Sequence, residues 1–227
     1  AMFVVGDTLV VSADAAEIGG NDNKGSVHIF ERTGSTWAEA QVLTASDGAA
    51  SDQFGMHLAF DGATIAIGAH GQDIGGNANQ GAVYIFEKVS GSWTQTQKLV
   101  SSDGAASDLF GIDVALDAGT LAIGSTGSDP SGISAAGAIY VFEKVAGSWS
   151  QVQKIVASDG GDLDQLGTFI ALSGDTMASN SPRADIGANT AQGAVYVFKK
   201  TGGTWAQVQK LTASDGRQNE KLGTALA

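Results

Sequence analysis

Apolar and polar positions along the chain repeat with a period of 56 residues. The glycine that opens the phrase Gly-Ala-Val-Tyr-Ile-Phe at 81–86 has counterparts at Gly25, Gly137 and Gly193, each 56 residues from the next. The tryptophans keep the same spacing, at Trp37, Trp93, Trp149 and Trp205. The chain is therefore a tandem array of four units. Because stacked repeats depend on their neighbours for burial, the array is expected to form one domain.

Within one unit the pattern predicts four short strands. Residues 54–60 and 64–68 are largely apolar runs joined by the turn pair Asp61-Gly62. Residues 82–87 form a third apolar run, and 93–100 alternate apolar with polar residues, as a half-exposed strand does. No stretch of the chain keeps a helical period. Four-stranded antiparallel units of this length in tandem are typical of propeller blades, so the sequence predicts an all-β β-propeller.

The two ends of the chain complement each other in this register. Residues 4–44 supply the second, third and fourth strands of a blade, and 222–227 supply a first strand alone. We therefore expect the C-terminal strand to join the N-terminal blade and close a ring, since closure removes unpaired sheet edges. The domain spans 1–227, with repeat units at about 1–45 together with 216–227, 46–101, 102–157 and 158–213.

Two forms of ring closure fit this register. Closure within one chain gives four blades, whereas closure between two chains gives an eight-bladed ring. Closely set blades need small residues between their faces, and the first two strands of each unit are rich in Ala and Gly. The sequence therefore favours a homodimer that closes an eight-bladed ring.

Composition narrows the classes of partner. The net charge is −12, from 12 Lys and Arg against 24 Asp and Glu, and an acidic surface repels phosphate backbones. Nucleic acid is therefore not an expected partner. The chain has no Cys, and no apolar run approaches the ~20 residues that span a bilayer. No basic and then apolar stretch marks a signal peptide at its start.

Several of the repeated phrases resemble a known family. Phe54-Gly55 followed by Ile67-Gly68-Ala69-His70 resembles the FG-GAP repeat of integrin-type β-propellers, and Ser102-Asp103-Gly104 with Leu109-Phe110-Gly111 looks like its bacterial branch. The resemblance covers all four repeats. It implies a propeller, commonly of seven blades, that serves extracellular recognition or cell adhesion.

The chain departs from this family at the calcium loop. Integrin-type repeats often carry an Asp-x-Asp-x-Asp-Gly run between the first two strands, whereas here that link is as short as Asp61-Gly62-Ala63. Calcium takes six to eight oxygen ligands, which a short turn with one carboxylate does not supply. No cofactor is therefore expected, and calcium is not carried over from the resemblance.

Acidic residues recur in register and are weak candidates for cation or ligand sites on the rim of the propeller. The alternative, which we favour, is turn capping and a solvated acidic surface, because Asp-Gly and Ser-Asp are ordinary turn sequences. The candidates are Asp47, Asp52, Asp73, Asp103, Asp108, Asp129, Asp159, Asp164, Asp185 and Asp215.

Aromatic and histidine residues supply the remaining candidates. The four tryptophans, Trp37, Trp93, Trp149 and Trp205, are weak candidates for sugar stacking, but packing beneath the next blade with a bonded indole N–H is the favoured interpretation. His28, His57 and His70 share no register, and no nucleophile motif is present. No catalytic residues are therefore assigned.

Together these patterns predict a non-catalytic interaction or adhesion module, or a self-assembling repeat scaffold, of a bacterial surface or secreted protein. One alternative is a propeller lectin with one carbohydrate site per blade. Another is an engineered or excised set of repeats whose function is its own folding and assembly. An enzyme ranks last. The expected partner is a protein or glycan, and the expected location is extracellular or at the cell surface, with no signal peptide in this chain.

Overall fold

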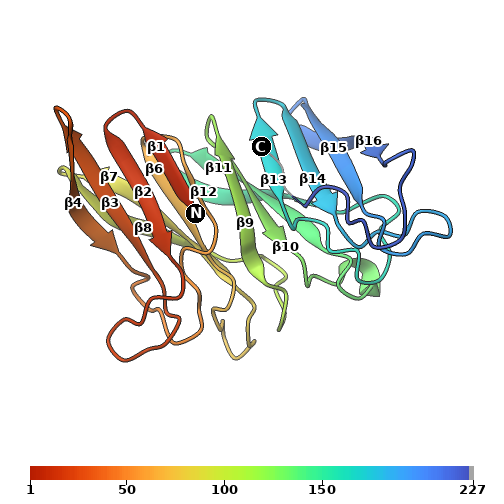
Figure 1. Cartoon of the computed structure of the whole chain (residues 1–227), viewed down its shortest axis with the longest axis horizontal. Helices are drawn as coiled ribbons and strands as arrows, with labels where there is room; N and C mark the ends of the chain where they lie inside the picture. The colour runs from red at the N-terminus through yellow and green to blue at the C-terminus, as the bar shows by residue number, and fades with distance from the viewer. Residues whose placement is uncertain (225–227) are drawn as a thin grey trace.

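The computed structural model describes residues 1–224 and consists of four four-stranded antiparallel sheets, which follow one another in chain order (Figure 1). This confirms the predicted all-β tandem architecture. The first sheet comprises β1 (Met2–Val5), β2 (Thr8–Ala13), β3 (Ser26–Thr33) and β4 (Thr36–Leu43). The second comprises β5 (Leu58–Phe60), β6 (Thr64–Ala69), β7 (Ala82–Val89) and β8 (Ser92–Leu99). The third comprises β9 (Phe110–Asp117), β10 (Thr120–Ser125), β11 (Ala138–Val145) and β12 (Ser148–Ile155), and the fourth β13 (Ile170–Ser173), β14 (Thr176–Ser181), β15 (Ala194–Thr201) and β16 (Thr204–Leu211).

Turn chemistry explains where the strands end. The β7–β8 hairpin turns at Ser90 and Gly91, whose φ angles of 52° and 90° are both left-handed. Two-residue turns with both φ angles positive match the twist of the strands that they join. Ala146 and Gly147 form the same turn between β11 and β12.

The prediction that the N-terminal blade has no first strand of its own is wrong. Residues Met2–Val5 form β1, which pairs with β2 in antiparallel register from Met2 opposite Val11 to Val5 opposite Thr8. This strand has four residues and lacks the Phe-Gly or Leu-Gly pair that marks the first strand in the other units, so the repeat pattern does not reveal it. The first sheet is therefore complete within residues 2–43.

The predicted C-terminal strand at 222–227 falls partly outside the described residues, which end at 224. Leu222 nevertheless lies in the place that its register predicts. Its backbone N–H donates to the Gln192 carbonyl at 2.9 Å, as that of Phe110 does to Gln80. The start of a further repeat is thus hydrogen-bonded to the fourth sheet in the same way as the start of the third repeat unit is to the second sheet. The strand pairing that would close a ring is not seen in residues 1–224.

The core consists of three apolar layers, each between two neighbouring sheets. Ile29 of the first sheet packs with Ile67 and Trp93 of the second, and Ile85 of the second packs with Ile123 and Trp149 of the third. The third layer joins Val141 to Tyr196, Phe198 and Trp205 in the same way. Each sheet therefore presents its tryptophan side to the sheet before it and its other side to the sheet after it.

Only the middle sheets are buried on both sides. Every residue of β6 and of β10 is buried, whereas burial alternates from Thr8 to Val11 in β2. Since successive side chains of a strand point to opposite faces, alternating burial means that one face has no neighbour. The first and fourth sheets each keep one uncovered face, which we call the first and the fourth end face.

Candidate functional site

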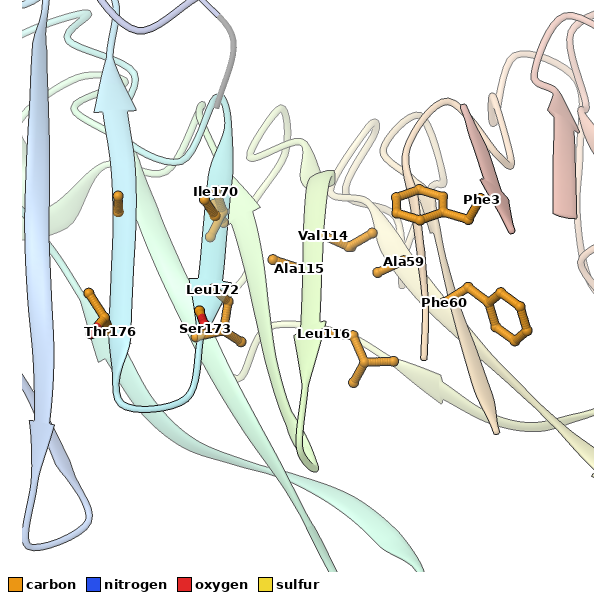
Figure 2. A pocket seen from close by; sticks show the side chains of 12 residues that line it. Phe3, Ala59, Phe60, Val114, Ala115, Leu116, Ile170, Leu172, Ser173 and Thr176 are labelled. Carbon is orange, nitrogen blue, oxygen red and sulfur yellow. The ribbon is translucent and has the colours of Figure 1, made fainter. Parts of the chain in front are cut away.

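A groove runs along the first strands of all four sheets (Figure 2). It has a volume of about 510 Å³ and lies between β1, β5, β9 and β13, with a contribution from β14. Its lining is almost wholly apolar: Phe3, Ala59, Phe60, Val114, Ala115, Leu116, Ile170, Ala171, Leu172 and Ala178, with only Ser173 and Thr176 carrying side-chain hydroxyls. We call this cavity the inner groove.

The groove exists because first strands of neighbouring sheets contact each other along one side of the molecule. Val114 is buried between them, whereas Leu116, Leu172 and Phe3 remain partly exposed, and Phe3 shows 40% of its surface. Figure 2 shows the rings of Phe3 and Phe60 on one flank and Ile170 and Leu172 on the other. A groove with this lining suits the apolar part of a ligand. No residue that lines it carries an ionisable side chain.

A histidine–aspartate pair lies on the segments that form the wall of the groove. His57 Nδ1 is 2.9 Å from Asp113 Oδ1, and the other carboxylate oxygen accepts the backbone N–H of Ile170 at 2.6 Å. The His57 ring also faces Phe169, with 6.0 Å between centroids. His57, Asp113 and Phe169 occupy one register position in three successive repeats. The pair therefore ties three sheets together at a register position where the repeats carry three different residue types.

His70 is a second histidine near this pair. It is 9% exposed, and its Nδ1 has no hydrogen-bond partner among the described residues. Burial, reinforced by the proximity of His57, lowers the pKa of His70. Residues 1–224 contain no cluster of three or more His, Cys, Asp or Glu that would hold a metal ion.

The first acidic set joins neighbouring sheets. In each case a tyrosine hydroxyl of the next sheet donates to one carboxylate oxygen, and a lysine of the next sheet donates to the other. Asp103 accepts from Tyr140 at 2.8 Å and from Lys154 at 2.8 Å. Desolvation alone would raise the pKa of Asp103, but the bonds from Lys154 and Tyr140 outweigh it and hold that pKa below its usual value. Asp47 accepts the same two bonds from Tyr84 and Lys98. Asp159 accepts them from Tyr196 and Lys210.

The second and third acidic sets fasten loops. Asp108 accepts the backbone N–H of Ala105 at 2.9 Å, and desolvation raises the pKa of its carboxyl. Asp52 and Asp164 cap equivalent turns, at Ala49 and Gly161. Asp73, Asp129 and Asp185 each accept a backbone N–H six residues further on in their own loop. These contacts follow the turn-capping interpretation of the acidic residues. Asp215 is exposed, and no tyrosine or lysine of the described chain bonds to it.

The tryptophans divide into two kinds. Trp93, Trp149 and Trp205 are 4%, 4% and 3% exposed, so their rings lie inside the layers between sheets and offer no face to a sugar. Their indole nitrogens have no hydrogen-bond partner among the described residues, so the expected N–H bond is not seen. Trp37 is 38% exposed, with the Arg32 guanidinium 5.6 Å from its ring centroid.

Sequence reasoning missed the glutamine that fastens each tryptophan strand. The Gln97 side-chain amide donates to the Trp149 carbonyl at 2.7 Å, and its oxygen accepts the Trp149 backbone N–H at 2.9 Å. Gln41 and Gln153 make the same pair of bonds with Trp93 and Trp205. The only signal in the sequence is that glutamine recurs in register, which does not identify its partner.

The comparisons with known proteins identify the class of fold. The model of the FG-GAP repeat matches the chain at residues 37–86, 93–142 and 149–198, which together exceed half of its length. The chain therefore belongs to the FG-GAP repeat family. Each matched window runs from the outer strand of one sheet to the third strand of the next. No curated protein matches the chain.

Within residues 1–224, no helix has the length and apolar character needed to cross a membrane.

Proposed function

We propose that this chain is a non-catalytic interaction module of a bacterial surface or secreted protein, and that it holds a protein partner against the inner groove. The observation that carries the proposal is the contrast between two kinds of surface. The recurrent carboxylates of the inner repeats are engaged in turns and in contacts between sheets, whereas the groove is apolar and open. An apolar groove of this size suits side chains of a partner rather than an ion or a charged metabolite.

The proposal agrees with membership of the FG-GAP family, although fold alone does not determine function. A lectin with one sugar site per blade is less well supported, because three of the four tryptophans are buried. An enzyme is also less well supported, because Asp113 of the His57–Asp113 pair accepts a backbone N–H, the His57 ring lies at a tilt of 58° to Phe169, and no nucleophile of the described residues is adjacent.

A library of random peptides displayed on phage, selected on the purified chain, tests the groove. We expect enrichment of peptides with aromatic and branched side chains, and loss of their binding in Leu116→Lys and Leu172→Lys. Val145→Lys is the matched control, because Val145 is 61% exposed on a hairpin outside the groove. Enriched peptides that bind all three variants equally, or no enrichment at all, would contradict the proposal.

A further inference from the structure

The three contacts between sheets within the chain follow one rule. The later sheet contributes its tryptophan side, and the earlier sheet contributes a glutamine and a large aliphatic residue from its outer strand. At the contact between the second and third sheets these are Trp149, Gln97 and Leu99. A serine after the outer strand adds two bonds, since Gln151 accepts the Ser102 N–H and donates to its hydroxyl. The same contacts recur at the first junction.

The two end faces carry the two halves of this rule. The first end face consists of Leu9, Val11, His28, Phe30 and Trp37, which are the register equivalents of residues buried in the later sheets. The fourth end face consists of Ala178, Val197, Lys199, Gln209 and Leu211. These residues are the register equivalents of those that an earlier sheet contributes to a junction. Leu211 is 40% exposed, whereas its equivalent Leu99 is 3% exposed. Each end face thus carries the residues that form a junction elsewhere in the chain, but no second sheet lies against it within residues 1–224.

From this complementarity we infer that the fourth end face of one chain docks on the first end face of a second copy, and that two copies close a ring of eight sheets. The side-chain amide of Gln209 forms hydrogen bonds with the backbone N–H and carbonyl of the partner's Trp37, as that of Gln97 does with Trp149. Leu211 enters the apolar layer, and Ser214 meets the partner's Glu39 as Ser102 meets Gln151. Both ends of both chains are then covered, which is how unlike faces close into a ring instead of a filament.

The charged residues at the edge of the proposed junction differ from those at the junctions within the chain. This difference gives the sharpest test of the inference. Within the chain, a glutamate of the earlier sheet pairs with a lysine of the later one: Glu31 with Lys88 at 3.1 Å and Glu143 with Lys200 at 2.6 Å. At the new junction the glutamate position holds Lys199, and the residue opposite is Arg32 of the second copy. The internal Glu–Lys pair therefore has no counterpart there. Lys199 instead faces an arginine that Asp7 of its own chain holds at 2.6 Å, which weakens this junction relative to the internal ones.

A single substitution should repair this pair. Lys199→Glu places a carboxylate opposite Arg32, and Thr176 is positioned to bond to it as Thr8 bonds to Glu31 at 3.0 Å. Association of the two copies should tighten by about three- to tenfold. Leu211→Arg should abolish association, because it places a charge in the apolar layer. Val145→Arg, on an exposed hairpin of the third sheet, is the matched control and should leave association unchanged.

The measurement is the mass in solution as a function of concentration, by sedimentation equilibrium and native mass spectrometry. We expect the mass of two 22.9 kDa chains for the unchanged protein and for Val145→Arg, and the mass of one chain for Leu211→Arg. A single-chain mass for both the unchanged protein and Lys199→Glu, or a ladder of larger masses, would overturn the inference. Circular dichroism of each variant checks that it folds.

A cross-link identifies the faces. The natural chain has no Cys, so Ser214→Cys with Glu39→Cys provides the only two thiols for a short thiol-reactive cross-linker. Two chains should be joined, whereas the internal pair Ser102→Cys with Gln151→Cys should be joined within one chain. Cross-linking of 214 to 39 within a single chain would overturn the inference. Leu116→Lys in the inner groove should leave the mass unchanged, so failure of this inference and failure of the proposed function are distinguishable.

Discussion

The middle sheets and the end sheets differ in burial much more than they differ in sequence. Trp149 and Trp37 occupy the same register position, yet the first is 4% exposed and the second 38%. The strands β10 and β2 likewise occupy the same place in their sheets, but β10 is buried throughout and β2 on one face only. The sequence of a repeat therefore prepares both of its faces for burial, and the presence of a neighbouring sheet decides whether burial occurs.

This comparison makes quantitative predictions when matched residues are changed in middle and end sheets. The measurements belong at protein concentrations where the mass is that of one chain, because association would add stability to the end faces. Raising the concentration then reports on the end faces alone.

The largest difference is expected for tryptophan. Trp149→Ala should reduce the free energy of unfolding by about 3–5 kcal/mol, because it opens a cavity within the layer between the second and third sheets. Trp37→Ala should cost less than about 1 kcal/mol, since no sheet covers that ring. Urea unfolding of both variants measures the pair. Equal losses would mean that the first end face is already covered.

A smaller difference is expected for glutamine. Gln97→Ala leaves the backbone N–H and carbonyl of Trp149 without their side-chain partner, at a cost of about 1–3 kcal/mol. Gln209→Ala should change stability by no more than about 0.5 kcal/mol in the single chain. Hydrogen exchange of the Trp149 amide gives a local readout. It should accelerate in Gln97→Ala and remain unchanged in Gln209→Ala.

Acid should remove one contribution of the middle sheets. The pKa of Asp103 is lowered in the folded state, so its contribution is complete above the ordinary aspartate pKa of about 3.9 and is lost as pH falls through the lowered value. Asp103→Asn should cost about 0.5–1 kcal/mol at pH 7, because the carboxylate is half exposed, and progressively less as the solution is acidified below pH about 4. Asp215→Asn should leave stability unchanged at either pH. A cost of Asp103→Asn that did not fall with pH would contradict the ionic part of the contact.

The smallest difference is expected for the ion pairs at the rim. Glu87→Gln removes the partner of Lys144, and exposed pairs contribute about 0.2–1 kcal/mol. Lys199→Gln removes no ion pair among residues 1–224 and should be neutral in the single chain. Repeating both measurements in high salt checks the assignment, because the cost of Glu87→Gln should shrink and that of Lys199→Gln should not change.

The 56-residue period located most strands. The strands that it missed or misplaced have physical explanations as well. It correctly placed the hairpins, because Gly91 and the alternation of β8 are local signals. It missed β1, because four residues without a Phe-Gly or Leu-Gly pair carry no repeat signal. It also placed the start of the second sheet's first strand at residue 54, whereas β5 begins at Leu58 and Gly55 adopts a φ of +98°. A short strand that depends on its neighbours cannot be delimited from local pattern alone.

The candidate site was less predictable than the fold. The recurrence of Asp103 and Trp149 was visible in the sequence, but an aspartate in a turn looks the same whether or not a tyrosine from the next sheet bonds to it. The inner groove has no sequence signature, since Leu116 and Leu172 belong to ordinary apolar strands. His57 and Asp113 differ from their repeat equivalents, yet nothing in the sequence showed that two residues 56 positions apart form a pair.

The sequence by itself determined the number of repeats, the antiparallel strands within each and the FG-GAP character of the chain, because these depend on local alternation, turn residues and a fixed period. Only the tertiary structure decided which copy of each residue is buried, which carboxylates join sheets, and where the groove lies. These properties depend on the sheet that lies opposite each face. The repeats encode faces that are alike, and the packing of the sheets formed by residues 1–224 leaves two of these faces uncovered.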